Sequence, residues 1–484
     1  MPILLISSGL VLFALGISAG ADPRAFALLT LGTTAVALFH EQMFRWHVLV
    51  GAVVAVILFV PIKRYALPGQ LPFDLELYRL TIALVIALWI AALLVDDRVA
   101  LRTSGLGGPL ALVALAMAGS ILTNLDRIQT LDLSSDVVKK TLFFFSFYLV
   151  VFLVVSIVRD AGTINAVIKT LVGGTAIVAL FALVERRTAY NAFDHLQAIA
   201  PFLQFEGEEG DIARGGRLRV YGPAQSPIAL AVLFAMMVPL AVYVGRLTRR
   251  WWWWLATAII VLGLFSAVSR TGIVALAVIA LVFIWLRRQE MKTLLPFVLP
   301  LLIAVHIVTP GAIGGLRQAF FPSQGLVEDQ TVYGGRLSAE RVGPQIDIIK
   351  AQPFFGQGFG TRLVLGPKAN ARVLDNEWLG TASEIGLVGI FALAWLFIRF
   401  IKRLGREAKE DSSARGALLV ALASAIAGFA VGMFTYDAFS FIQVTFVLFI
   451  MLGLGMSALQ SEERWSFHES GSIRRLRVLP QSSA

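Results

Sequence analysis

Cysteine is absent from this chain of 484 residues, and charged residues make up only 15% of it. Without cysteine there is no disulfide, no thiolate nucleophile and no thiolate metal site. The five histidines are scattered without metal-ligand spacing, so we predict neither a metal nor a cofactor. Hydrophobic residues are abundant instead, at 57%, which is typical of a polytopic membrane protein. The net charge of +10 fits basic loops beside anionic lipids, and we expect no nucleic-acid partner.

Apolar runs of a length suited to membrane spans recur along the chain. They lie near residues 3–20, 25–39, 47–62, 78–95, 107–123, 141–158, 164–184, 226–245, 251–267, 271–286, 293–309, 385–401, 416–434 and 438–459. The predicted fold class is therefore all-α, a polytopic transmembrane helical bundle of about 12–14 spans. The first run resembles a signal peptide but lacks its basic n-region, so we interpret it as a retained first helix.

Basic short connections set the predicted orientation. They hold Arg246, Arg249 and Arg250; Arg287, Arg288 and Lys292; and Lys402, Arg403, Arg406 and Lys409. The positive-inside rule places these connections and both termini in the cytoplasm. We therefore expect N-terminal helices over 1–309, an extracytoplasmic loop over 310–384 that caps a membrane cavity, C-terminal helices over 385–460 and a cytoplasmic tail over 461–484. Within the loop, residues 338–351 could form an amphipathic helix.

Arg270 is the only charge between Trp251 and Leu286, in an apolar run that suits two spans. A lone arginine at the centre of a spanning helix costs roughly 2.5–3.5 kcal/mol on insertion scales. We therefore place it at the turn of a tight outer hairpin, where Ser269 and Thr271 could cap the helix ends. A fixed outer arginine suits an anion such as a phosphate. The alternative is an arginine that only reaches lipid headgroups or caps a helix.

Other outer residues could share a site with this arginine. The cations are Arg214, Arg217, Arg219, Arg336, Arg341, Arg362, Lys368 and Arg372. Several of them facing one cavity would bind a diphosphate. Asp375, which with Asn376 precedes an apolar helix, is a candidate general base, although this pair could equally be a helix cap. Glu384 is a second carboxylate candidate, or a residue that only favours a helix N-terminus.

Four segments occur in an informative order. They are residues 217–228 (Arg-Leu-Arg-Val-Tyr-Gly-Pro-Ala-Gln-Ser-Pro-Ile), residues 269–272 (Ser-Arg-Thr-Gly), residues 353–361 (Pro-Phe-Phe-Gly-Gln-Gly-Phe-Gly-Thr) preceded by Arg336 and Arg341, and residues 375–389 (Asp-Asn-Glu-Trp-Leu to Glu-Ile-Gly-Leu-Val-Gly). This set resembles the O-antigen ligase and O-antigen polymerase (Wzy/WaaL-like) superfamily of bacterial membrane glycosyltransferases. Residues 434–440 resemble its late outer turn. Ligases typically place histidine where Asp375 stands, so the aspartate form is more similar to the exopolysaccharide polymerase branch.

The resemblance implies a glycosyltransferase that uses undecaprenyl-diphosphate-linked oligosaccharide and polymerises surface polysaccharide on the outer face of the bacterial cytoplasmic (inner) membrane. It implies catalytic roles for Asp375, Arg270 and Arg341. It implies diphosphate or glycan binding by Arg214, Arg217, Arg219, Arg336, Asn376 and Glu384. Expected partners are the lipid-linked glycan, membrane lipids, and polysaccharide export or chain-length proteins.

Two other functions stay open at this point. One is ligase-type transfer of the glycan to a lipid or protein acceptor. The other is a flippase for the lipid-linked oligosaccharide, which should show broken helices or charges at mid-membrane. Only Lys169 has the position of an intramembrane charge in the sequence. A structural scaffold would leave the ordered motifs unexplained.

Overall fold

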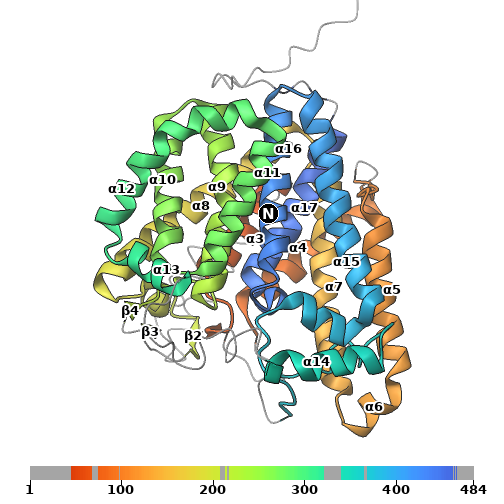
Figure 1. Cartoon of the computed structure of the whole chain (residues 1–484). Coiled ribbons are helices and arrows are strands. Elements are labelled where there is room, and N and C mark those ends of the chain that lie inside the picture. Colours follow the sequence, from red (N-terminus) through yellow and green to blue (C-terminus); the bar gives the residue numbers. More distant parts are fainter. Residues whose placement is uncertain are drawn as a thin grey trace, which may run out of the picture.

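The computed structural model describes residues 45–67, 75–96, 99–207, 213–214, 217–320, 339–364, 368–461, 463 and 465. In these residues the chain forms one helical bundle, with helices that run up and down between two ends (Figure 1). The longer helices are α3 (Trp46–Phe59), α4 (Leu77–Val95), α5 (Gly107–Thr123), α7 (Ser134–Ile157), α8 (Ala161–Thr188), α9 (Pro227–Thr248), α10 (Trp251–Ser266), α11 (Arg270–Leu294), α12 (Val298–Val308), α15 (Glu377–Glu410), α16 (Ala414–Gly432) and α17 (Ile442–Gln460).

Short elements gather at one end of the bundle, the lower end in Figure 1. They include α6 (Leu125–Thr130), the 3₁₀ turn η1 (Ala192–Ala198), α13 (Ala312–Phe320) and α14 (Ala339–Ala351). Two antiparallel pairs of two-residue strands accompany them: β1 (Tyr65–Ala66) with β2 (Gln204–Phe205), and β3 (Ala213–Arg214) with β4 (Arg217–Leu218). We call this end, which also holds the start of α15, the motif end. The connections with clustered arginines and lysines lie at the opposite end.

The predicted all-α polytopic bundle is confirmed. Among the described residues, eight helices are long and apolar enough to span a membrane, and α3, α5 and α10 are shorter apolar helices. Every run predicted from residue 47 onward coincides with a helix, and the amphipathic helix predicted at 338–351 is α14. The runs predicted at 3–20 and 25–39 lie outside the described residues.

The predicted start of α15 differs most from the structure. α15 begins at Glu377 rather than at 385, because polar residues that interrupt the apolar pattern are paired by tertiary contacts at the motif end.

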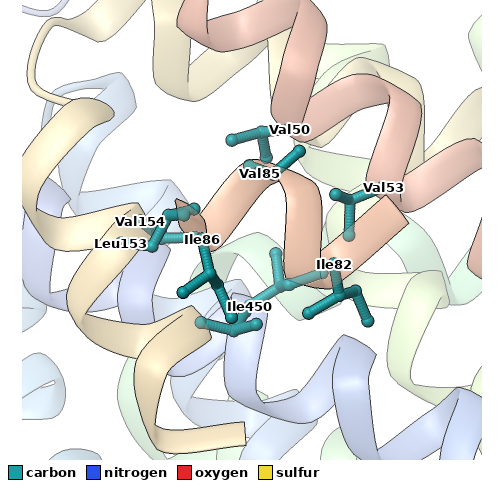
Figure 2. A pocket seen from close by; sticks show the side chains of 9 residues that line it. Val50, Val53, Ile82, Val85, Ile86, Leu153, Val154 and Ile450 are labelled. Atoms are coloured by element: carbon teal, nitrogen blue, oxygen red, sulfur yellow. The ribbon is translucent and has the colours of Figure 1, made fainter. Parts of the chain in front are cut away.

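Helix α4 lies at the periphery, with only 22% of its most apolar stretch buried. Its inner face packs against α3, α7 and α17 through aliphatic side chains. Figure 2 shows Ile82, Val85 and Ile86 of α4 meeting Val50 and Ile450 from two of these neighbours. The gap between them has a volume of about 10 Å³, which admits at most a single water molecule. This part of the interface between α4 and its neighbours is therefore closely packed.

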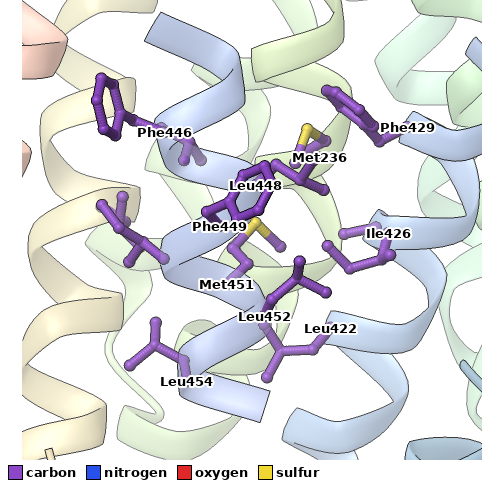
Figure 3. Packing of buried hydrophobic residues seen from close by; sticks show 14 of the residues in the cluster. Met236, Leu422, Ile426, Phe429, Phe446, Leu448, Phe449, Met451, Leu452 and Leu454 are labelled. Atoms are coloured by element: carbon purple, nitrogen blue, oxygen red, sulfur yellow. The ribbon is translucent and has the colours of Figure 1, made fainter. Parts of the chain in front are cut away.

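The centre of the bundle is formed by α9, α16 and α17, whose most apolar stretches are 89%, 83% and 94% buried. Figure 3 shows Met236 of α9, Phe429 of α16 and Phe449 of α17 interdigitating there. Small residues bring two further helices close. A Cβ added at Gly428 of α16 would lie 2.6 Å from Ile279 of α11, so these two helices pack closely at this glycine. This rigid centre fixes the helix ends that carry the motifs.

Candidate functional site

Asp437 connects two of the motif segments at the motif end. Its side chain is 8% exposed and lies in the turn between α16 and α17, which we call the 433–440 turn. One carboxylate oxygen accepts the backbone N–H of Leu374 at 3.2 Å, and the other accepts that of Asn376 at 3.1 Å. The residue between these two amides is Asp375. The carboxylate of Asp437 therefore holds the backbone on both sides of the predicted base.

Glu377 fastens the same two segments in the opposite direction. Its backbone N–H donates to the carbonyls of Met433, at 2.8 Å, and Tyr436, at 3.1 Å. Its carboxylate accepts the N–H of Phe439 at 2.9 Å. Because each segment supplies both donors and acceptors to the other, the 433–440 turn and the start of α15 form one unit.

Asp375 has a left-handed backbone, with φ of 52°, and its side chain is half-buried. Only glycine adopts this region freely, and aspartate and asparagine tolerate it better than other residues. The helix cap belongs to its neighbour: the side chain of Asn376 accepts the N–H of Leu379 at 3.1 Å. The helix cap of this pair is therefore Asn376 and not Asp375.

Helix α15 is broken at Gly386, where φ is 68° and ψ is −169°. The glycine-rich turn at 353–358 fills the break. Leu387 donates to the Pro353 carbonyl at 2.8 Å, and Gln357 donates to the Ser383 carbonyl at 2.9 Å. The two backbones are so close that a Cβ at Gly386 would lie 2.2 Å from the carbonyl oxygen of residue 354. Gly356 and Gly386, one from each motif, are thus explained by one close backbone contact.

Two further segments join this unit. The tip of the α10–α11 hairpin approaches through Thr271, whose hydroxyl accepts from that of Thr435 at 2.8 Å. Gln225, from the segment before α9, accepts the N–H of Ile442 at 2.7 Å. All five segments singled out in the sequence therefore meet at the motif end, around the 433–440 turn and the start of α15.

A cavity of about 840 Å³ opens beside this unit, between α4, α5, α7, α15 and α17. Toward the motif end its wall carries five cations and three carboxylates, which gives a positive balance. The cations are Lys63, Arg79, Lys139, Lys140 and Arg362; the carboxylates are Asp136, Glu377 and Glu384. Farther along α4 and α7 the wall is apolar, with Ile86, Ile90 and Leu149. Such a cavity suits an amphiphile with an anionic head and a long apolar tail.

Lys140 and Glu384 form an ion pair in the wall of this cavity, with 2.6 Å between the lysine nitrogen and a carboxylate oxygen. The glutamate side chain is 10% exposed and the lysine side chain is 39% exposed. Lys63 lies in the loop after α3, and burial lowers the pKa of its ammonium group despite the opposing charge of Glu76. A ligand anion would find both lysines already positioned.

The other predicted site residues are distributed as follows. Arg270 is the first residue of α11 and is half-buried, at the hairpin tip that touches the 433–440 turn. Arg219 is half-buried in the segment before α9. Neither of them lines the 840 Å³ cavity. Arg214 and Arg217 face each other across the β3–β4 pair, and Arg341 lies in α14, but their side chains are outside the described residues, as is the whole of Arg336.

One expectation about the hairpin is wrong. Ser269 occupies the cap position of α11, but its side chain makes no cap hydrogen bond, and Thr271 lies inside the helix. The Ser269 hydroxyl is instead buried against the packed hairpin tip. The hairpin tip is oriented by close packing against α9, because a Cβ added at Gly272 would lie 2.6 Å from the Cβ of Ala231.

The cavity lysines Lys139 and Lys140 were not predicted. They lie between the predicted runs at 107–123 and 141–158, whereas α7 already begins at Ser134. A signal was present, because two adjacent lysines on the predicted outer side oppose the positive-inside rule. Cations kept there against that rule are candidates for binding an anion.

Comparison with known families adds an independent observation. Residues 255–394 match the family described as O-antigen ligase. Over these residues the chain is similar to that family, which supports the resemblance to the O-antigen ligase and polymerase superfamily. The matched region contains the 269–272 hairpin, the 353–361 turn and the α15 break. The segments 217–228 and 434–440 lie outside it and join it through the contacts described above. No curated protein matches the chain.

Proposed function

We propose that this chain is a membrane glycosyltransferase of the O-antigen ligase and polymerase superfamily, whose donor is an undecaprenyl-diphosphate-linked oligosaccharide. The observation that carries the proposal is the cavity: its cationic wall at the motif end suits a diphosphate, and its apolar wall along α4 and α7 suits a polyprenyl chain. The peripheral position of α4 gives a lipid tail access from the bilayer. A nucleotide is not needed, because the diphosphate already activates the sugar.

The chemistry requires a base and a site for the leaving group. An acceptor hydroxyl attacks the anomeric carbon of the donor, the bond from that carbon to the diphosphate oxygen breaks, and the polyprenyl diphosphate leaves. The hydroxyl proton passes to the carboxylate of Asp375. Charge that develops on the diphosphate is stabilised by fixed cations. Asp375 does not line the cavity itself, but it lies two residues before Glu377, which does.

We further propose that the acceptor is a second lipid-linked repeat unit, so that the product is a polymer. Aspartate rather than histidine at position 375 supports the polymerase over the ligase. We propose catalysis on the outer face of the bacterial cytoplasmic membrane, because the basic connections lie at the end opposite the site.

A reconstitution experiment tests the proposal. Purified protein in liposomes is given undecaprenyl-diphosphate-linked repeat units, and the products are resolved by size. A ladder of repeats is expected. Single additions to a lipid or protein acceptor would identify a ligase, and unaltered glycan that has crossed the bilayer would identify a flippase.

The Asp375→Asn variant tests the base within the same assay. Asparagine tolerates the left-handed backbone, and the helix cap belongs to Asn376, so the fold should be unchanged. We expect intact donor binding and at least a 100-fold loss of transfer. Lys368→Gln is the matched control, because this motif-end cation pairs with exposed Asp132 and does not line the cavity. Wild-type turnover by Asp375→Asn would exclude the proposed base.

A further inference from the structure

We infer that Asp437 is a positioning residue, which fixes the backbone of Asp375 and thereby aims the carboxylate of Asp375 at the acceptor. This inference rests on the proposed role of Asp375 as the base. It starts from a feature that the reaction chemistry leaves unused, a buried aspartate in the 433–440 turn. Residue 437 lies beyond the matched family region, which ends at 394.

Asp437 is not itself suited to be the base. Both of its carboxylate oxygens already accept backbone N–H groups, at 3.1 and 3.2 Å, and its side chain is 8% exposed. It does not line the cavity. A base must reach the acceptor hydroxyl with a free lone pair in a productive direction. The geometry of Asp437 satisfies a different requirement.

The two amides that Asp437 accepts flank a single residue. The backbone N–H groups of Leu374 and Asn376 donate to the two oxygens of one carboxylate. The backbone of residues 374–376 therefore bends around this carboxylate, and we call this bend the arch. Asp375 stands at the top of this arch with its left-handed φ of 52°. An aspartate does not adopt that conformation at no cost, since left-handed residues cost roughly 1–2 kcal/mol. Two charge-assisted hydrogen bonds offset this cost and hold the arch.

The arch is anchored to the rigid part of the molecule. Glu377 binds the same turn through the N–H of Phe439 and through its own backbone N–H. Trp378 donates to the Ala430 carbonyl of α16 at 2.9 Å, so the first turn of α15 is tied to the bundle centre. A displacement of about 1 Å at a catalytic group can cost roughly 100-fold in rate. Loss of the Asp437 carboxylate should therefore affect turnover much more than substrate binding.

The test compares Asp437→Asn, Asp375→Asn and the double variant in the reconstituted transfer assay. In Asp437→Asn the side-chain NH2 group faces one of the two backbone N–H donors and cannot accept from it, so one of the two hydrogen bonds is lost. We expect kcat to fall at least 10-fold and KM for the lipid-linked donor to change less than threefold. We expect the double variant to be no slower than Asp375→Asn alone, because residues that act through one group are not additive.

Each outcome separates this inference from the proposed function. If Asp375→Asn is inactive while Asp437→Asn has wild-type kcat, the positioning role is wrong and the base stands. If the two losses multiply in the double variant, Asp437 acts independently of Asp375 and the inference is overturned. If Asp375→Asn is fully active, the proposed base itself fails.

Hydrogen exchange can be measured on the wild-type protein, so this test does not depend on the folding of any variant. The amides of Leu374 and Asn376 should exchange slowly, although they precede the helix, because both are bound to a buried carboxylate. The exposed residues Lys368 and Ala369 provide the fast reference in the same segment. Exchange of the two amides at the rate of that reference would overturn the arch, whatever the Asp437 variants show.

Discussion

Gly386→Ala is the substitution for which the structure gives the firmest estimate. At φ of 68° and ψ of −169°, Gly386 occupies a region that is nearly restricted to glycine, and a side chain there costs about 1–3 kcal/mol. The added Cβ would also lie 2.2 Å from the carbonyl oxygen of Phe354 and 2.6 Å from the nitrogen of Phe355. Both atoms belong to the backbone, so the 353–358 turn has to move away as a whole.

That movement has a second cost. It lengthens the hydrogen bonds from Leu387 to Pro353, at 2.8 Å, and from Val388 to Phe354, at 3.3 Å. At roughly 0.5–1.5 kcal/mol for each bond, the total destabilisation is about 2–6 kcal/mol. The free energy of unfolding can be measured by titrating the protein, held in detergent micelles, with a denaturing surfactant.

Gly343→Ala is the matched control for this measurement. Gly343 lies in α14 at the same end, and a Cβ there meets nothing within 4 Å. The control should be neutral or gain up to about 1 kcal/mol in helix propensity. Equal free energies of unfolding for the two variants would refute the close contact between the 353–358 turn and the α15 break. We also expect Gly386→Ala to lose transfer activity, because Glu384 lies beside the break.

Three other predictions concern charge and topology. Lys140→Gln should raise KM for the lipid-linked donor about 10- to 100-fold, as expected for a charge-assisted hydrogen bond of roughly 1.5–3 kcal/mol, whereas an unchanged KM would remove this lysine from the donor site. Arg270→Ala and Arg270→Lys should both abolish polymer formation at normal protein levels, because lysine lacks the bidentate fork; full activity of the alanine variant would refute a substrate role. In this cysteine-free chain, Ala369→Cys should react with a membrane-impermeant thiol reagent in intact cells and Ser412→Cys only after permeabilisation, and the reverse pattern would invert the topology. Position 324, a more obvious choice in the long loop, lies outside the described residues.

The helices were predictable from sequence because long apolar runs have few alternatives to a spanning helix. The start of α15 was not predictable in the same way. Glu377 and Glu384 interrupt the apolar pattern, and tertiary partners stabilise their carboxylates inside the bundle: the N–H of Phe439 for one and the ammonium of Lys140 for the other. Local sequence contains no information about a partner that is 244 residues away.

The candidate site was likewise only partly predictable from the sequence. The motifs identified which segments would matter, and the structure brings those segments together. The motifs did not indicate that Asp437 accepts the backbone N–H groups on both sides of Asp375. These contacts depend on the fold of a turn more than 60 residues later. The cavity depends in addition on α4 and α7, neither of which carries a motif. Motif order therefore predicted which segments meet at the motif end, but not the helices that form the rest of the cavity wall.

The broken helix α15 bears directly on the choice between an enzyme and a transporter. Transporters use breaks near mid-membrane, where unwound backbone groups bind the substrate or an ion. Here the break at Gly386 lies next to the motif-end boundary of the apolar run predicted at 385–401. Its backbone groups are already paired: Ser383 and Glu384 accept N–H groups from the 353–358 turn, and Leu387 and Val388 donate to it. These four backbone groups are therefore not available to a cargo. The break does orient Glu384 toward Lys140 and the cavity wall, which is the requirement of a rigid site for group transfer.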